Sequence, residues 1–234
     1  MREEAWWQPL LTAAKRNLVP GLCLQAIAVI LVGTYYFVPA AHSSFETVAR
    51  WKVDGGYFFA AISTALAAGL IPWLIDRLRG TSSARHPYAD GLFVCAIWAY
   101  RGAEIDAFYR LQAWLFGSGH DVTTIASKVA LDMLCYAPLW AQPTMVAMYA
   151  VRKYDFNLSA LRREWNWRRF FYDVLLIQTS GWIVWIPTVC IVYSLPSDLQ
   201  FPLFAIMVCF WSLLLVALTD KRSSQKAQVI VAPV

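Results

Sequence analysis

The sequence predicts an all-α fold: a polytopic bundle of about six transmembrane helices with both termini on the cytoplasmic side. Charged residues make up 15% of the chain and hydrophobic residues 59%, whereas a soluble domain carries roughly 25% charged residues. The mean hydropathy is +0.47, and the apolar residues form runs of about the 20 residues that a spanning helix needs. We therefore expect one transmembrane domain over residues 1–222 and a flexible tail over residues 223–234.

Six segments are long enough to span a bilayer, and they leave only short connections between them. The expected spans are residues 18–38, 57–75, 92–116, 129–151, 174–197 and 201–219. The first has too long an apolar core, and too acidic a leader at Glu3 and Glu4, for a cleaved signal peptide. The third differs from the others because its second half carries four charged residues.

The basic residues determine the expected orientation. Six spans place fifteen of the twenty lysines and arginines on the side that holds both termini, and only Arg50 and Lys52 in the loops of the other side. Cytoplasmic loops carry such an excess of Lys and Arg, so we expect both termini on the cytoplasmic face. Basic loops beside an anionic leaflet also account for the net charge of +5 without a nucleic-acid partner.

One connection, residues 152–171, combines arginines with aromatic residues. Its candidate lipid contacts are Arg162, Arg163, Arg168, Arg169 and Trp165. Basic and aromatic side chains at the level of the lipid headgroups are the usual anchors of a membrane protein. The segment either anchors the chain in the bilayer or binds anionic lipid or a partner, and a homo-oligomer is also compatible with the sequence.

Charged residues inside the expected spans are the main candidates for a functional site. Such residues are costly in a bilayer and tend to face a protein interior or an aqueous path. On the third span Arg101 and Glu104 are three residues apart, and Asp106 and Arg110 are four apart. Each pair can meet on one helix face. At about 100° per residue, the two pairs lie on nearly opposite sides of the helix.

On the fourth span Lys128 and Asp132 are again four residues apart, so their charges can cancel locally. Two interpretations of the charged residues remain open. They line a hydrophilic pathway, with Lys128 and Asp132 as its midsection or gate, or they are satisfied ion pairs that lock helices together. The candidates for this pore or polar core are Lys128, Asp132, Glu104, Asp106, Arg101 and Arg110.

No arrangement of residues indicates catalysis, a metal or a cofactor. The three histidines fall in different expected loops and the five cysteines in different expected spans, without a C-x-x-C pair. There is also no glycine-rich phosphate loop and no G-x-S-x-G nucleophile motif. We therefore expect a protein that is not an enzyme and that needs no cofactor.

One stretch is more specific than composition: residues 128–138 read KVALDMLCYAP. This stretch resembles the K-x-x-x-D-Q-x-x-x-x-P signature of the Mpv-seventeen type family of peroxisomal and mitochondrial inner-membrane proteins, with Met133 in place of the glutamine. Residues 106–111 and 185–187 are similar to two further family motifs, and the resemblance covers roughly residues 56–220. Cys190 and Tyr193 stand where the family carries Gln and Asn.

The resemblance implies an all-helical membrane protein, described in this family as a channel-like pore for small solutes, and it singles out Lys128 and Asp132. Our leading hypothesis is an integral membrane protein that forms such a pore for small polar solutes or ions. The alternative is a structural or scaffolding membrane protein that organises a complex or lipid, with the intramembrane charges as helix locks. The expected location is the inner (cytoplasmic) membrane of a bacterium, or the mitochondrial inner or peroxisomal membrane of a eukaryote.

Overall fold

The computed structural model describes residues 8–80 and 86–231, with side chains up to residue 214 except those of residues 9 and 10. This part of the chain is almost entirely helical and contains no strand, which confirms the all-α class. The elements are α1 (Gln8–Phe37), η1 (Pro39–Ala41), α2 (His42–Thr64), η2 (Ala65–Leu70), α3 (Ile71–Leu78), α4 (Pro87–Phe116), α5 (Val122–Ala130), η3 (Leu131–Ala141), α6 (Gln142–Lys153), α7 (Leu158–Glu164), α8 (Trp167–Tyr193) and α9 (Ser197–Val231).

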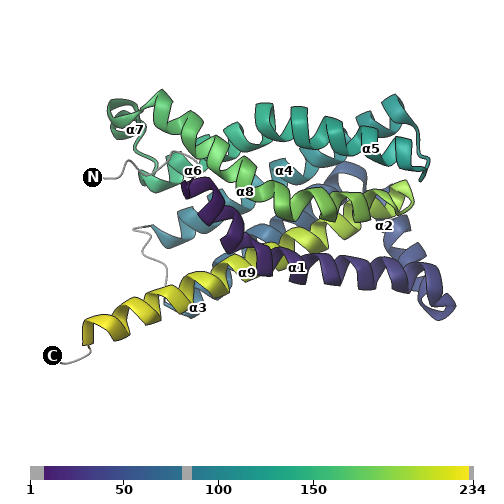
Figure 1. The fold of residues 1–234 in the computed structure, drawn as a ribbon, viewed down its shortest axis with the longest axis horizontal. Coiled ribbons are helices and arrows are strands. Elements are labelled where there is room, and N and C mark those ends of the chain that lie inside the picture. The colour runs from purple at the N-terminus through teal and green to yellow at the C-terminus, as the bar shows by residue number, and fades with distance from the viewer. Residues whose placement is uncertain (1–7, 81–85, 232–234) are drawn as a thin grey trace.

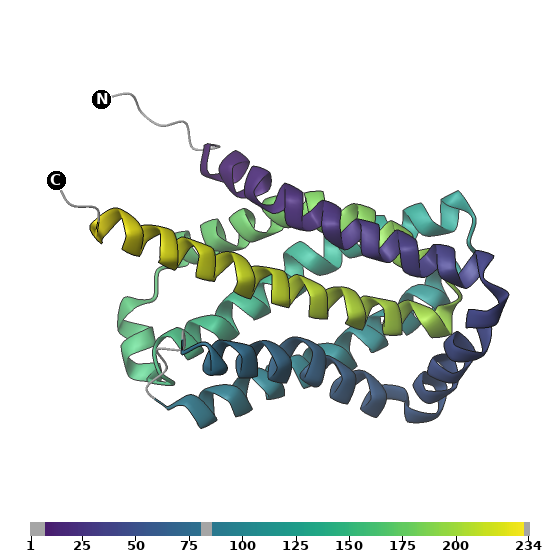
Figure 2. The ribbon, with the colours of Figure 1, turned by 90° about the horizontal axis from the view of Figure 1, so that it is seen from below.

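The chain runs back and forth along the long axis of a helical bundle (Figure 1). Its passes are α1, α2–η2–α3, α4, α5–η3–α6, α8 and α9. α1 begins and α9 ends at the same end of the bundle (Figures 1 and 2), as an even number of passes requires. We name this the N/C end, and the opposite end the far end. By length and composition, five helices of the described chain can cross a membrane.

The pass that falls outside this set of five is α4. It is 30 residues long, like α1, but it carries the four charged residues noted above. α4 packs mainly on α2 and η2. A Cβ atom at Gly102 would lie only 2.3 Å from the Ala60 carbonyl oxygen, and one at Gly91 only 2.5 Å from the Trp73 ring. These glycines allow close approach, which brings the charged residues of α4 near partners on other helices.

The second pass is interrupted twice. At Gly56 the backbone adopts φ 48° and ψ −127°, which kinks α2 there. A residue without a Cβ atom tolerates a positive φ, and the expected second span begins at the next residue, Tyr57. Farther along, η2 is a π-helical segment, and η3 interrupts the fourth pass in the same way. π-Helical turns are frequent at functional sites.

The apolar core lies mainly toward the far end. Its most buried members include Leu24 of α1, Val184 and Tyr193 of α8, and Phe201 and Met207 of α9. α8 and α9 are joined at the far end (Figure 1), so these residues of α8 and α9 lie in the halves nearest that turn. The segment expected to be a tail continues α9 as far as Val231, and residues 232–234 lie outside the described chain.

Candidate functional site

α4 carries two ion pairs, and each has the helical spacing expected from the sequence. Arg101 Nη1 lies 2.8 Å from Glu104 Oε2, and Arg110 Nε lies 3.0 Å from Asp106 Oδ2. The first pair contacts η3 and α6, whereas the second contacts α2. The prediction that the two pairs lie on different sides of the helix is confirmed.

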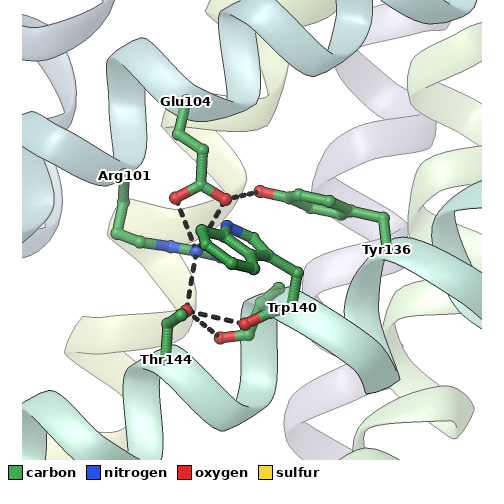
Figure 3. A network of polar contacts seen from close by, with 6 residues as sticks. Arg101, Glu104, Tyr136, Trp140 and Thr144 are labelled. Carbon is green, nitrogen blue, oxygen red and sulfur yellow. Dashed lines mark hydrogen bonds and ion pairs between the residues drawn. The ribbon is translucent and has the colours of Figure 1, made fainter.

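The Arg101–Glu104 pair is held by two residues of the neighbouring pass (Figure 3). Tyr136 of η3 donates its hydroxyl to Glu104 Oε1 over 2.6 Å, and Arg101 Nη1 lies 3.4 Å from Thr144 Oγ1 of α6. The Arg101 guanidinium also lies 5.9 Å from the centre of the Tyr136 ring, within cation–π range. Both charges therefore have partners, and the pair connects α4 with η3 and α6.

Asp106 is held between two cations. Lys52 Nζ of α2 lies 2.8 Å from Asp106 Oδ1, and Arg110 Nε forms an ion pair with Asp106 Oδ2 at 3.0 Å. The Asp106 and Lys52 side chains are buried, but that of Arg110 is half-exposed and lies over the Tyr57 ring at 4.8 Å. Lys52 lies in an expected loop, and the sequence does not predict it as a partner of Asp106. The Gly55-Gly56 pair indicates a turn but does not show which helix Lys52 meets.

Lys128 and Asp132 do not form the ion pair that their spacing permits. Asp132 instead accepts a 2.6 Å hydrogen bond from the hydroxyl of Tyr193, 61 residues away on α8. Lys128 is 1% exposed and makes no ion pair with any residue of the described chain. Its backbone carbonyl accepts a hydrogen bond from Gln112 Nε2 at 2.9 Å. Helical spacing allows a contact, but here the packing of α8 against η3 supplies a different partner.

η3 places Asp132 beside a backbone carbonyl that a proline has freed. A π-helix pairs the carbonyl of residue i with the amide of residue i+5, and Pro138, five residues after Met133, has no amide hydrogen. The Met133 carbonyl accepts instead from Gln178 Nε2 at 3.2 Å and Trp182 Nε1 at 3.1 Å, both on α8. Pro138 thus creates the acceptor that ties η3 to α8 next to Asp132.

A cavity of about 1060 Å³ lies inside the bundle, and all six passes contribute to its wall. Arg16, near the start of α1, and Arg152, near the end of α6, lie at its N/C end. Its inner end, near the middle of the bundle, is formed by Tyr109 of α4 and Asp132 of η3. Beyond them toward the far end, the buried Tyr193 fills the space between the helices.

The cavity separates the candidate residues into two groups. Arg101 and Asp132 line it, but Lys128, Glu104, Asp106 and Arg110 do not. Most of its wall is apolar, and its aromatic residues include Trp98, Tyr136, Trp182, Trp185, Phe204 and Trp211. The polar path expected from the sequence is therefore not one continuous lining. Two of the six candidates line the cavity, and the other four lie outside its lining.

The lipid-contact candidates lie together at the N/C end, around the turn from α7 to α8 (Figure 1). The four arginines, Arg162, Arg163, Arg168 and Arg169, are exposed and Trp165 is half-buried. The Trp165 ring contacts those of Trp167 and Phe170, with centroids 5.4 and 5.1 Å apart. The aromatic residues thus form one compact cluster flanked by arginines, as at a membrane interface.

In the described part of the chain, no three His, Cys, Asp or Glu residues are grouped closely enough to hold a metal ion. No protein-family model, curated protein or solved structure matches this sequence. The resemblance to the Mpv-seventeen type family therefore remains a prediction. The fold and composition define the class, an integral membrane protein of the helical-bundle type.

Proposed function

We propose that the protein is a channel-like pore that lets small polar solutes or ions cross a membrane, with the cavity as its solute chamber. The observation that supports the proposal is the cavity itself, which extends from Arg16 and Arg152 at the N/C end to Asp132 in the middle of the bundle. Charged residues within a membrane protein usually mark such pathways, and Arg101 and Asp132 are the two candidates that line it.

In this proposal the described conformation is closed on one side. Tyr109 and Tyr193 pack edge to face, with ring centroids 5.4 Å apart, and Tyr193 is held by its hydrogen bond to Asp132. A solute that enters from the N/C end meets this barrier near the middle of the bundle. Passage to the far end therefore requires the two tyrosines to separate, and Asp132 is the residue placed to couple that movement to the solute.

The test is a flux measurement with purified protein in liposomes. The wild type should accelerate the release of small polar solutes, and Asp132→Asn should change the rate. Asp198→Asn, at an exposed position near the start of α9 that does not line the cavity, is the matched control and should behave as the wild type. Well-folded wild-type protein that leaves liposome permeability unchanged would overturn the proposal.

A second candidate is a structural or scaffolding role. It is favoured by one observation: four of the six candidate residues lie outside the cavity lining, and two of those four, Glu104 and Asp106, join α4 to other helices through a hydrogen bond and an ion pair. Such pairs can fix the packing of helices without a transported solute. Co-purification of a stoichiometric partner, together with liposomes that stay impermeable, would support this role over the pore.

A further inference from the structure

Three oxygen atoms of the cavity lining make no hydrogen bond with the described residues: Asp132 Oδ1, Gln178 Oε1 and the hydroxyl of Tyr109. Asp132, 6% exposed, uses Oδ2 to accept from Tyr193, and its Oδ1 accepts from none of them. Gln178, 5% exposed, donates through Nε2 to the Met133 carbonyl, which leaves its Oε1 buried and unpaired. Both residues line the cavity. Because a buried unpaired acceptor is unfavourable, a group with N–H donors is the natural complement of this site.

The charge balance at the same place favours a cation. Arg101 lines the cavity too, but its charge is matched by Glu104 at 2.8 Å. Asp132 has no ion pair with any described residue, so its carboxylate is the unmatched charge at the inner end. Of the two arginines at the N/C end, Arg152 is paired with Asp90 at 2.8 Å, and Arg16 is exposed. A buried carboxylate is costly unless a positive charge is placed beside it.

The walls point to an organic cation rather than a bare ion. The indole of Trp182 is fixed beside Asp132 by its hydrogen bond to the Met133 carbonyl. Trp185 contacts Trp211 and Phe204, with ring centroids 6.2 and 5.9 Å apart, and all three line the cavity. Aromatic walls attract cations and bury apolar groups. The volume of about 1060 Å³ slightly exceeds the range typical for sites of drug-sized molecules.

From these observations we infer that the cavity binds a small organic ammonium ion: a protonated primary or secondary amine on an apolar or aromatic body. The ammonium group donates to Asp132 Oδ1, and the body lies against the tryptophan-rich wall toward the N/C end. This inference rests on the proposed function, because it names the class of solute for the same cavity. Its binding step, however, can be measured without any transport.

The experiment is equilibrium dialysis of full-length protein in detergent micelles against radiolabelled tryptamine. The matched competitors are indole-3-propionate, which replaces the ammonium by a carboxylate, and the N,N,N-trimethyl derivative of tryptamine, which keeps the charge but has no ammonium N–H donor. Tryptamine should bind saturably, and the trimethyl derivative at least fivefold more weakly. Indole-3-propionate should not compete. Asp132→Asn should weaken tryptamine binding at least tenfold, whereas Asp198→Asn should not change it.

The variant test remains interpretable because the Asn amide oxygen can still accept the Tyr193 hydrogen bond, and a melting curve checks its fold. If Asp132→Asn unfolds, the affinities of the wild type for the three ligands still test the inference. Equal or stronger binding of indole-3-propionate, or no saturable binding of tryptamine, would overturn the inference. Saturable binding without flux in liposomes would instead contradict only the pore, and flux without a preference for cations would contradict only the organic ammonium site.

Discussion

The hydroxyl of Tyr193 on α8 donates a 2.6 Å hydrogen bond to Asp132 on η3, and this contact lies where the cavity ends and the buried core begins. Tyr193 is 0% exposed and Asp132 6% exposed. Hydrogen bonds to charged groups are worth more than neutral ones. The contact therefore both stabilises the packing of α8 on η3 and closes the cavity on its inner side.

Removal of this hydroxyl should destabilise the fold. Tyr193→Phe leaves Asp132 without a hydrogen-bond donor among the described residues, and we expect a loss of about 1.5–3 kcal/mol of unfolding free energy. Circular dichroism during denaturation in mixed micelles measures it. Tyr36→Phe is the matched control, because the Tyr36 hydroxyl donates to the Ser194 carbonyl at an exposed site. A loss no greater than that of the control would contradict the structural role of the Asp132 contact.

The Lys52–Asp106 pair should behave as a helix lock. Removing one partner of a buried ion pair leaves an uncompensated charge, which costs about 3–5 kcal/mol. Asp106→Leu leaves the buried Lys52 without a partner and should lower the melting temperature strongly. Lys52→Met should lower it less, because Arg110 still pairs with Asp106, and the double variant should recover much of the Asp106→Leu loss. Arg110→Ala should cost less than about 1 kcal/mol, because that side chain is half-exposed. Additive losses in the double variant would show that the two charges are not coupled.

The close approach of α4 to α2 predicts a strong effect at Gly102. A Cβ atom there would lie 2.3 Å from the Ala60 carbonyl oxygen and 2.6 Å from Thr64 Oγ1, so Gly102→Ala forces the two helices apart. We expect a lower melting temperature and lower yield of folded protein. Gly33→Ala on α1 is the control, since a Cβ atom there meets nothing within 4 Å, and alanine is the better helix former. Equal melting of both variants would argue against this packing.

Labelling of single cysteines should distinguish positions on the cavity wall, which water reaches, from positions in the buried core. In a background without the five native cysteines, Met145→Cys lies on the cavity wall and Val192→Cys in the core. A membrane-impermeant thiol reagent added to proteoliposomes should react with the first position and not with the second. Protection of position 145 as well would mean that water does not reach the cavity, and the proposed pore would lose its main support.

The N-terminus of α5 gives a prediction for acid conditions. The Asp121 side chain accepts from the Thr124 amide at 3.0 Å and from its hydroxyl at 2.6 Å, and these hydrogen bonds lower the pKa of the Asp121 carboxyl. A carboxyl whose pKa is lower in the folded state stabilises the folded protein at pH values above the unfolded pKa of about 3.9. This stabilisation is lost as the pH falls through the pKa of the folded state. The melting-temperature difference between the wild type and Asp121→Asn should therefore shrink in acid. A difference that does not vary with pH would contradict this linkage.

The local features of the molecule were predictable because they depend on neighbours in the chain. The positions of the apolar passes, and the ion pairs Arg101–Glu104 and Arg110–Asp106, follow from run length and from helical spacing. Even the placement of these pairs on different sides of α4 follows from 100° per residue.

The partners of the charged residues could not be predicted in the same way. Lys52 of α2, on the N-terminal side of the kink at Gly56, pairs with Asp106 on α4, and Tyr193 reaches Asp132 from 61 residues farther along the chain. Tyr193 has an apolar ring and stands in an apolar run, so its sequence context indicates core packing and gives no hint of a polar contact. Gln178 is polar, but its partner is a carbonyl freed by a proline on another pass and could not be predicted from its own span.

The sequence by itself determined the class of this protein, because a chain with 15% charged residues and long apolar runs can satisfy its backbone polar groups in a bilayer only as helices. It also determined that α4 would carry charges and that these would pair locally. Only the tertiary structure decided which charges share a cavity. Arg101 and Asp132 do and Lys128 does not, because the walls of a cavity are set by the packing of six passes and not by spacing within one.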